Sequence, residues 1–261
     1  MNSIKNLEAV TTCIGYDDFL AETVKWNIPL FDRWIIVTDP SDTATREVCR
    51  KFNLQCLLSE DGKKEKADFA KGRLIDRALK MLSADSWRLH IDADIALPHR
   101  FRHLLEMACL QEDMIYGIDR VMVKSWEQWQ KLLGTGYMQG GQYNYQCYVQ
   151  FPEGFQLGTR WANPQVGWCP IGFFQMWHGS QDEWRGTWVK SYPTTHNTGC
   201  RTDVQHALQW DRTKRALIPE AIGVHLESED SPRGANWKGR KSKRFGPKAA
   251  DYKHTESFGG S

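Results

Sequence analysis

The first 120 residues alternate short apolar runs with longer segments whose apolar residues recur every three or four positions. This alternation is typical of a parallel β-sheet covered by helices. The run 34–38, Trp-Ile-Ile-Val-Thr, is apolar, as in a strand that is buried on both faces. We therefore expect an α/β fold with a mostly parallel sheet flanked by helices. The expected strands are residues 7–14, 34–38, 54–58, 87–91 and 113–118, and the expected helices are residues 17–27, 42–52, 67–82 and 99–110.

One of these strands ends in two carboxylates. The run 87–91, Trp-Arg-Leu-His-Ile, leads directly into Asp92-Ala93-Asp94, and Pro98 then ends regular structure. Ligands of open α/β sheets bind beyond the carboxyl ends of the strands. Carboxylate oxygens suit hard cations such as Mg²⁺ or Mn²⁺, which also bind phosphate oxygens. The stretch therefore predicts a site for a metal and a diphosphate, and a polar turn after a strand is the alternative.

Beyond residue 120 the chain becomes rich in Gly, Trp, Tyr and Gln. Residues 134–141 (Gly-Thr-Gly-Tyr-Met-Gln-Gly-Gly) are expected to form a flexible loop, and they lack the Lys-Ser/Thr pair of a phosphate-binding loop. We expect a turn and strand at 170–177, a short helix at 202–210 and a last strand at 221–226.

The chain holds 12 tryptophans, several of them in this Gly-rich region. Trp177, Trp184 and Trp188 could stack on an acceptor molecule. Each of them taken singly fits a core position better than a binding platform. So many in one region nevertheless predict that at least one is exposed in a cleft.

A net charge of +2 identifies no partner, but the charge is unevenly distributed. Residues 237–248 contain six basic residues and no acidic one. Three interpretations stay open. The run is a solvated tail, or its first members, Lys238 and Arg240, contact the diphosphate, or it holds a polyanion such as DNA, RNA or an anionic membrane surface.

The seven cysteines include no C-x-x-C pair and the chain has no N-glycosylation sequon. This pattern indicates reduced thiols in a cytosol-like compartment. The N-terminus lacks the apolar core of a signal peptide, and no apolar run approaches the ~18 residues of a membrane span. We therefore expect a cytoplasmic protein without a transmembrane segment.

Together, the α/β first half, the strand that ends in Asp92-Ala93-Asp94, the aromatic second half and a His near the end resemble the GT-A glycosyltransferases. The resemblance is strongest to the family-2-like inverting enzymes and covers about residues 7–245. It implies a GT-A-like, Rossmann-related catalytic domain at 1–245 and a flexible tail at 246–261. Residues 1–120 would form the nucleotide-sugar-binding half and residues 121–245 the acceptor-side half.

The implied activity is transfer of a sugar from a nucleotide-diphosphate sugar, UDP-linked, to an acceptor hydroxyl with inversion. The divalent metal, Mn²⁺ or Mg²⁺, would neutralise the diphosphate and stabilise the leaving nucleotide. The resemblance makes Asp94 a metal ligand, Asp92 a contact of the ribose or the metal, and His225 a further ligand at a strand end. A structural role is the alternative for a lone His.

The resemblance also places residues of the first half around the nucleotide. Thr11 and Thr12 would line the base, and Asp39 would accept hydrogen bonds from uracil or ribose unless it is only a turn residue or cap. Lys71-Gly72-Arg73 resembles a K-x-R pattern in which the Arg reaches the base or phosphate. Gly72 costs a solvent-facing helix ~1 kcal/mol against Ala, which a close approach to a ligand would explain.

Inverting transfer needs a general base that deprotonates the acceptor hydroxyl. The corresponding position is Asp203, at the start of the late helix. Many relatives carry two acidic residues there, whereas this chain has Thr202-Asp203, and an ordinary helix N-terminal Asp is the alternative. Gly172 resembles the glycine of a turn beside the donor sugar, followed by Phe173 and Phe174 in the core.

Three other functions compete with this hypothesis. The same chemistry could act on a hydroxylated base in DNA, held by the basic run. A nucleotidyltransferase that makes the activated sugar would share the sheet and the acidic ligands, but residues 13–17, Cys-Ile-Gly-Tyr-Asp, are not a Gly-rich loop followed by Arg and Lys. A carbohydrate-binding protein on a degenerate transferase fold would have no use for Asp203 beside a metal.

Overall fold

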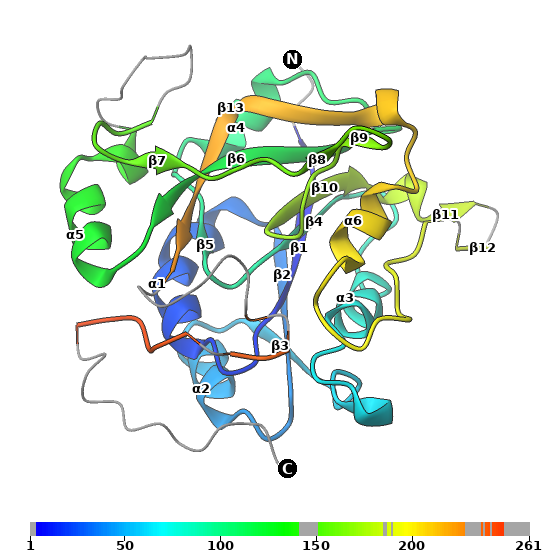
Figure 1. Ribbon diagram of the computed structural model, residues 1–261, viewed down its shortest axis with the longest axis horizontal. Helices are drawn as coiled ribbons and strands as arrows, with labels where there is room; N and C mark the ends of the chain where they lie inside the picture. The colour runs from blue at the N-terminus through cyan, green and yellow to red at the C-terminus, as the bar shows by residue number, and fades with distance from the viewer. Residues whose placement is uncertain are drawn as a thin grey trace.

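A computed structural model describes residues 4–140, 151–184, 187–188, 190–227, 236, 238–240 and 242–247, without the side chains of 183, 184, 187 and 188. One nine-stranded sheet runs through both halves of the chain, with helices packed against it (Figure 1). Its strand order is β3-β2-β1-β4-β10-β6-β13-β5, and β7 pairs with β6. The structure is therefore a mixed α/β fold, as the sequence predicts.

The first four strands of the sheet are all parallel. Every residue from Trp34 to Val37 is at most 6% exposed, so the apolar run is a strand buried on both faces. These strands are β1 (Leu7–Thr12), β2 (Arg33–Thr38), β3 (Gln55–Leu58) and β4 (Trp87–Ile91).

The helices of the first half lie close to their expected positions. Asp42 caps α2, since its carboxylate accepts the backbone N–H of Thr45 at 3.0 Å. Only α3 begins clearly later than expected, because Glu65 and Lys66 take positive φ angles in a 3₁₀ turn just before it. The helices are α1 (Asp17–Asn27), α2 (Thr43–Lys51), α3 (Lys71–Leu79) and α4 (Phe101–Met107).

The second half adds strands to the same sheet. β10 lies antiparallel between β4 and β6, while β13 runs parallel to β6 and antiparallel to β5. The sheet is therefore mixed rather than mostly parallel, because four of its strand pairings are parallel and four are antiparallel. The elements are β5 (Ile95–Ala96), β6 (Ile115–Val123), β10 (Phe174–His178), α6 (Thr202–Ala207) and β13 (Arg215–Leu226).

Short elements between residues 123 and 190 were not expected from the sequence. Residues 134–139, expected to be a loop, instead finish a helix and form a 3₁₀ turn, and residue 141 lies outside the described residues. The elements are α5 (Trp126–Gly134), the 3₁₀ turn Tyr137–Gln139, β7 (Gln156–Leu157), and the two hairpins β8 (Ala162–Asn163) with β9 (Gly167–Trp168) and β11 (Glu183–Trp184) with β12 (Thr187–Trp188).

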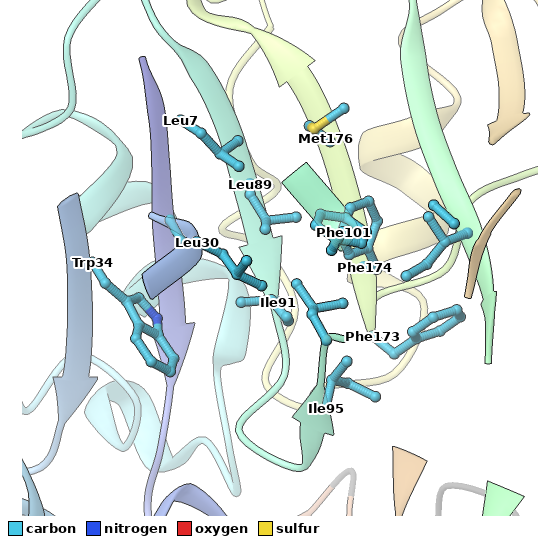
Figure 2. Packing of buried hydrophobic residues seen from close by; sticks show 14 of the residues in the cluster. Leu7, Leu30, Trp34, Leu89, Ile91, Ile95, Phe101, Phe173, Phe174 and Met176 are labelled. Atoms are coloured by element: carbon cyan, nitrogen blue, oxygen red, sulfur yellow. The ribbon is translucent and has the colours of Figure 1, made fainter. Parts of the chain in front are cut away.

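The core around the end of β4 is filled by aromatic and branched side chains. Figure 2 shows Leu89 and Ile91 of β4 packed beside Phe174 and Met176 of β10, with Phe101 close by. Phe173 is 8% exposed and Phe174 fully buried, so both belong to the core as expected. This packing fixes the place where β4 leaves the sheet. Within the described part of the chain, no helix is long and apolar enough to cross a membrane.

Candidate functional site

The Asp92-Ala93-Asp94 turn is held by the strands on both sides of it. The backbone N–H of Asp92 donates to Phe173 O at 3.1 Å, and the carbonyl of Asp94 accepts the N–H of Leu226 at 2.9 Å. Ala93 O accepts the hydroxyl of Thr23 at 2.7 Å. The two carboxylates therefore have fixed positions between the start of β10 and the end of β13.

Asp94 forms an ion pair with the histidine expected beside it. The His225 Nε2 atom lies 3.3 Å from Asp94 Oδ2, and its Nδ1 lies 3.5 Å from Glu227 Oε1. Burial raises the pKa of Asp94, but the imidazole of His225 and the ammonium of Lys71 outweigh it and leave that pKa below its ordinary value. The Asp94 Oδ1 atom is buried without a hydrogen-bond partner among the described residues.

Asp92 lies in a different electrostatic environment. Its Oδ1 is 2.5 Å from the Lys71 ammonium and 3.5 Å from Nε2 of the buried His90. Burial raises the pKa of Asp92 to about 6, with a further rise from Asp94, although Lys71 pulls it down. Burial also lowers the pKa of His90 well below its ordinary value, so His90 is neutral and Lys71 is the counter-ion of Asp92.

Asp203 is tied to the same place through the 172–173 turn. The Gly172 N–H donates to Asp203 Oδ2 at 2.5 Å, and Gln175 Nε2 donates to the Asp203 carbonyl at 2.8 Å. A Cβ atom on Gly172 would lie 2.8 Å from the Cβ of Asp203, so only glycine allows this approach. Since Asp92 is bonded to Phe173 O, the turn joins the candidate base to the carboxylate pair.

Among the described residues, no group of three or more His, Cys, Asp or Glu side chains is arranged closely enough to hold a metal ion. Of the three expected ligands, Asp94 and His225 lie close together, whereas Asp92 contacts Lys71 instead. The role of these three as ligands therefore stays a proposal.

Several residues expected around the nucleotide are engaged within the protein. Thr11 is fully buried and donates to Ile91 O at 2.8 Å, which leaves it no exposed surface for a base. Thr12 is 7% exposed. Asp39 accepts hydrogen bonds from both the N–H and the hydroxyl of Ser41, and together with Lys63 these outweigh the effect of its burial and lower its pKa.

The Lys71-Gly72-Arg73 pattern is at the site, but through a different residue than expected. Arg73 points to the loop before α3 and to residues 194 and 197, where its guanidinium bonds Thr194 O, Lys64 O and the Glu65 carboxylate. Lys71, which was given no role from the sequence, contacts Asp92. Gly72 is explained by packing rather than by a ligand, because its Cβ would lie 1.9 Å from Pro193 O.

The basic C-terminal segment is largely paired with helix α1. Arg240 donates to both oxygens of Asp18 at 2.5 and 2.8 Å, and also to Gly15 O. Arg244 pairs with Asp17 in the same way. Lys238 lies 3.6 Å from Asp68. The solvated-tail interpretation does not fit the described part of this segment, and Arg240 has no donor to spare for a diphosphate. The polyanion interpretation stays a prediction.

Of the three tryptophans proposed as acceptor platforms, one is excluded and two stay untested. Trp177 is fully buried, and its Nε1 donates to Asp182 at 2.7 Å, so it belongs to the core and cannot stack on an acceptor. Trp184 and Trp188 lie on the paired strands β11 and β12, and their side chains fall outside the described residues.

No family model matches the chain, and no curated protein does. Solved structures are similar to it, and three examples follow. Glucosyl-3-phosphoglycerate synthase from Mycobacterium tuberculosis with Mn²⁺, UDP-glucose and phosphoglyceric acid is 18% identical at a TM-score of 0.35, over 43% of each chain. The same synthase with Mn²⁺, UDP and glucosyl-3-phosphoglycerate is 13% identical at a TM-score of 0.47, over 85% of this chain and 70% of that one. Mannosyl-3-phosphoglycerate synthase from Rubrobacter xylanophilus is 14% identical at a TM-score of 0.45, over 87% and 68%.

The chain thus spans less than half of the first of these structures and about 70% of the second. At these identities the similarity concerns the course of the chain. What the site does has to be inferred from its own residues.

Proposed function

We propose that the chain is a GT-A-like, metal-dependent glycosyltransferase that moves a sugar from a UDP-sugar to an acceptor hydroxyl with inversion. One observation carries this proposal: Asp94 pairs with His225 where β4 leaves the sheet, and Asp92 and Asp203 are each hydrogen-bonded to the adjoining 172–173 turn. Two carboxylates and an imidazole for a metal, beside a separate carboxylate for a base, are what sugar transfer from a nucleotide donor requires.

The donor atoms at this place suit a hard divalent cation. Asp94 brings one oxygen paired with His225 and one that is buried without a partner among the described residues. An orphaned carboxylate oxygen of this kind is costly unless a cation or a hydrogen-bond donor occupies it. Asp94 and His225 would hold the metal, with Asp92 as a further ligand or a ribose contact. When bound, the metal neutralises the diphosphate and stabilises the charge on the leaving nucleotide.

Asp203 would act as the general base. One of its oxygens is fixed by the Gly172 N–H, and the other accepts no hydrogen bond from any described residue. A carboxylate held on one side and open on the other can take a proton from an acceptor hydroxyl. The nucleotide would lie toward β1 and β2, near Thr12 and Asp39 of the expected set and near Lys71, which the sequence did not single out.

A thermal-shift screen of UDP-sugars with and without Mn²⁺ tests this function. A ligand at 100 times its dissociation constant adds ~2.7 kcal/mol to the free energy of unfolding, which is readily measured. We expect a metal-dependent stabilisation by one UDP-sugar that is lost in Asp94→Ala and kept in Asp113→Ala. Asp113 is a suitable control because it is half exposed and its ion-pair partner, Lys214, precedes β13 at the end opposite to His225. A chain that responds to no nucleotide would contradict the proposal.

A further inference from the structure

Arg120 is a cation of this site that the sequence gives no reason to select. It lies on β6, opposite Gly223 of β13, and Met122 lies opposite His225 in the same parallel register. Residues two apart on a strand point to the same face, so Arg120 and His225 project from one face of the sheet.

The arginine side chain is held in a slot between two neighbours. Its Cζ atom lies 4.3 Å from the centre of the Phe173 ring. On the other side, a Cβ atom on Gly158 would lie 3.0 Å from Arg120 Nε, so a side chain there would push the guanidinium out. The Gly158 N–H also donates to the Arg120 carbonyl at 2.8 Å. A glycine on one face and an aromatic ring on the other give the guanidinium a fixed direction.

No described residue accepts a hydrogen bond from the Arg120 guanidinium, and its Nε is fully buried. The adjacent carboxylate, Asp119, is taken by Arg160, which donates to both of its oxygens at 2.8 and 2.5 Å. Burial lowers the pKa of Arg120, while Glu227, Asp94, Asp92 and Asp119 raise it again. The partly buried guanidinium therefore lies in the field of these carboxylates without bonding them, and its fully buried Nε is costly unless a ligand pairs with it.

The position of Arg120 indicates which part of the substrate it contacts. Lys71 approaches the carboxylates from α3, which packs on β1 and β2, whereas Arg120 approaches from β6, on the other side of β10 (Figure 1). Phe173, under the guanidinium, directly follows Gly172, which binds Asp203. The base has to touch the acceptor, so a group beside this turn is close to the acceptor rather than to the nucleotide.

We infer that Arg120 binds an oxyanion, a phosphate or a carboxylate, carried by the acceptor. This inference rests on the proposed function and adds to it the chemical class of the acceptor, an anionic molecule with a free hydroxyl. The planar fork of arginine matches two oxygens of such a group, and a lysine would not.

Inorganic phosphate serves as the probe, titrated calorimetrically into the protein with and without saturating UDP and Mg²⁺. Wild type should bind phosphate in both conditions, Arg120→Met about tenfold or more weakly, and Arg120→Lys in between. Arg215→Met is the matched control: Arg215 lies at the opposite end of the same strand pair and its guanidinium bonds Trp210 O and Val166 O. It should bind phosphate like wild type.

Melting temperatures separate the ligand role from a structural one. Arg120→Met removes a partly buried charge that no described residue pairs with, so its melting temperature should stay the same or rise, whereas that of Arg215→Met should fall. A clear loss of stability in Arg120→Met with unchanged phosphate binding would overturn the inference.

Three further outcomes distinguish failure of the inference from failure of the proposed function. If phosphate binds normally to Arg120→Met while UDP still stabilises it through Asp94, the acceptor inference fails and the proposed function stands. If Arg120→Met instead loses affinity for UDP and not for phosphate in the presence of UDP, the arginine belongs to the diphosphate and the acceptor assignment is wrong. Phosphate binding that depends on Arg120 in a protein that binds no nucleotide would support the anion site and contradict the proposed function.

Discussion

The Lys71 ammonium lies 2.5 Å from Asp92 Oδ1, and the two groups set each other's state. Asp92 is a carboxylate whose pKa burial raises to about 6 against the pull of Lys71. Lys71 therefore stabilises the ionised form of Asp92, which is the first carboxylate of the pair to take up a proton as the pH falls. Asp94, with His225 beside it, stays ionised to lower pH.

This difference predicts a pH dependence. Because the pKa of Asp92 is raised on folding, its contribution to stability is fully present below its unfolded pKa of about 4 and is lost as the pH rises through about 6. Metal binding has the opposite pH dependence: it strengthens as the pH rises, because it needs the ionised carboxylate. Stabilisation by Mg²⁺ plus UDP should therefore grow between about pH 5 and 7, as thermal unfolding can show.

Lys71→Met supplies the internal check on this pH dependence. Without the ammonium, the pKa of Asp92 should rise further, so the midpoint of the metal-dependent stabilisation should move to higher pH. Lys80→Met is the control, since Lys80 is half exposed and pairs with Asp76 on the far part of α3. An unchanged midpoint in Lys71→Met would show that Asp92 is not the titrating group.

Asp203→Asn separates an enzyme from a carbohydrate-binding protein on the same fold. The amide can still accept the Gly172 N–H, so donor binding and the melting temperature should be kept. Turnover should fall about 10²-fold or more because the base is lost. The measurement is the rate of UDP release in the presence of acceptor, and unchanged turnover would remove Asp203 from the mechanism.

The stereochemistry of the product tests the same residue independently. A base that deprotonates the acceptor during direct attack inverts the anomeric centre. The product formed from an α-linked UDP-sugar should therefore be the β-anomer, as the anomeric proton coupling in an NMR spectrum would show. An α-linked product would exclude Asp203 as the base of a single displacement. It would not contradict the proposed metal site.

The parallel half of the fold and the carboxylate pair were predictable because they depend on local patterns. Apolar runs of strand length predicted β1, β2 and β4. Asp92 and Asp94 were predicted to form a site because they follow directly after the last apolar residue of β4. The contacts of Arg73 and Lys71 were not predictable. Both lie in one turn of α3, and which of them faces Asp92 depends on how Gly72 packs on Pro193, more than 100 residues away.

Long-range pairing also explains the other errors. Trp177 is indistinguishable in sequence from an exposed tryptophan, and its burial follows from its place on β10 between β4 and β6. The basic run allowed a solvated tail because nothing in its own sequence shows that Asp17 and Asp18, more than 200 residues earlier, lie opposite Arg244 and Arg240.

Gly172→Ala should damage the site without unfolding the protein. The new methyl group would lie 2.8 Å from Asp203 Cβ, so the carboxylate has to move away from the turn. We expect kcat to fall by at least about tenfold, since small displacements of catalytic groups are costly. Gly134→Ala is the control, because a Cβ there meets nothing within 4 Å and should leave kcat unchanged. Equal rates in the two variants would show that the contact between Gly172 and Asp203 does not matter for turnover.

Asp18→Asn tests whether the C-terminal segment is part of the folded structure rather than a tail. The side chains of Asp18 and Arg240 are 5% and 12% exposed, and Asp18 also accepts the backbone N–H of Phe245 at 2.5 Å. Removing the charge leaves a buried guanidinium without its counter-ion, which costs about 3 kcal/mol in comparable pairs. Chemical denaturation should show this loss, while Asp113→Asn, whose partner Lys214 is exposed, should lose less than about 1 kcal/mol. Equal stability of Asp18→Asn and wild type would mean that the basic segment is not held on α1 in solution, and Arg240 would again be free to bind an anion.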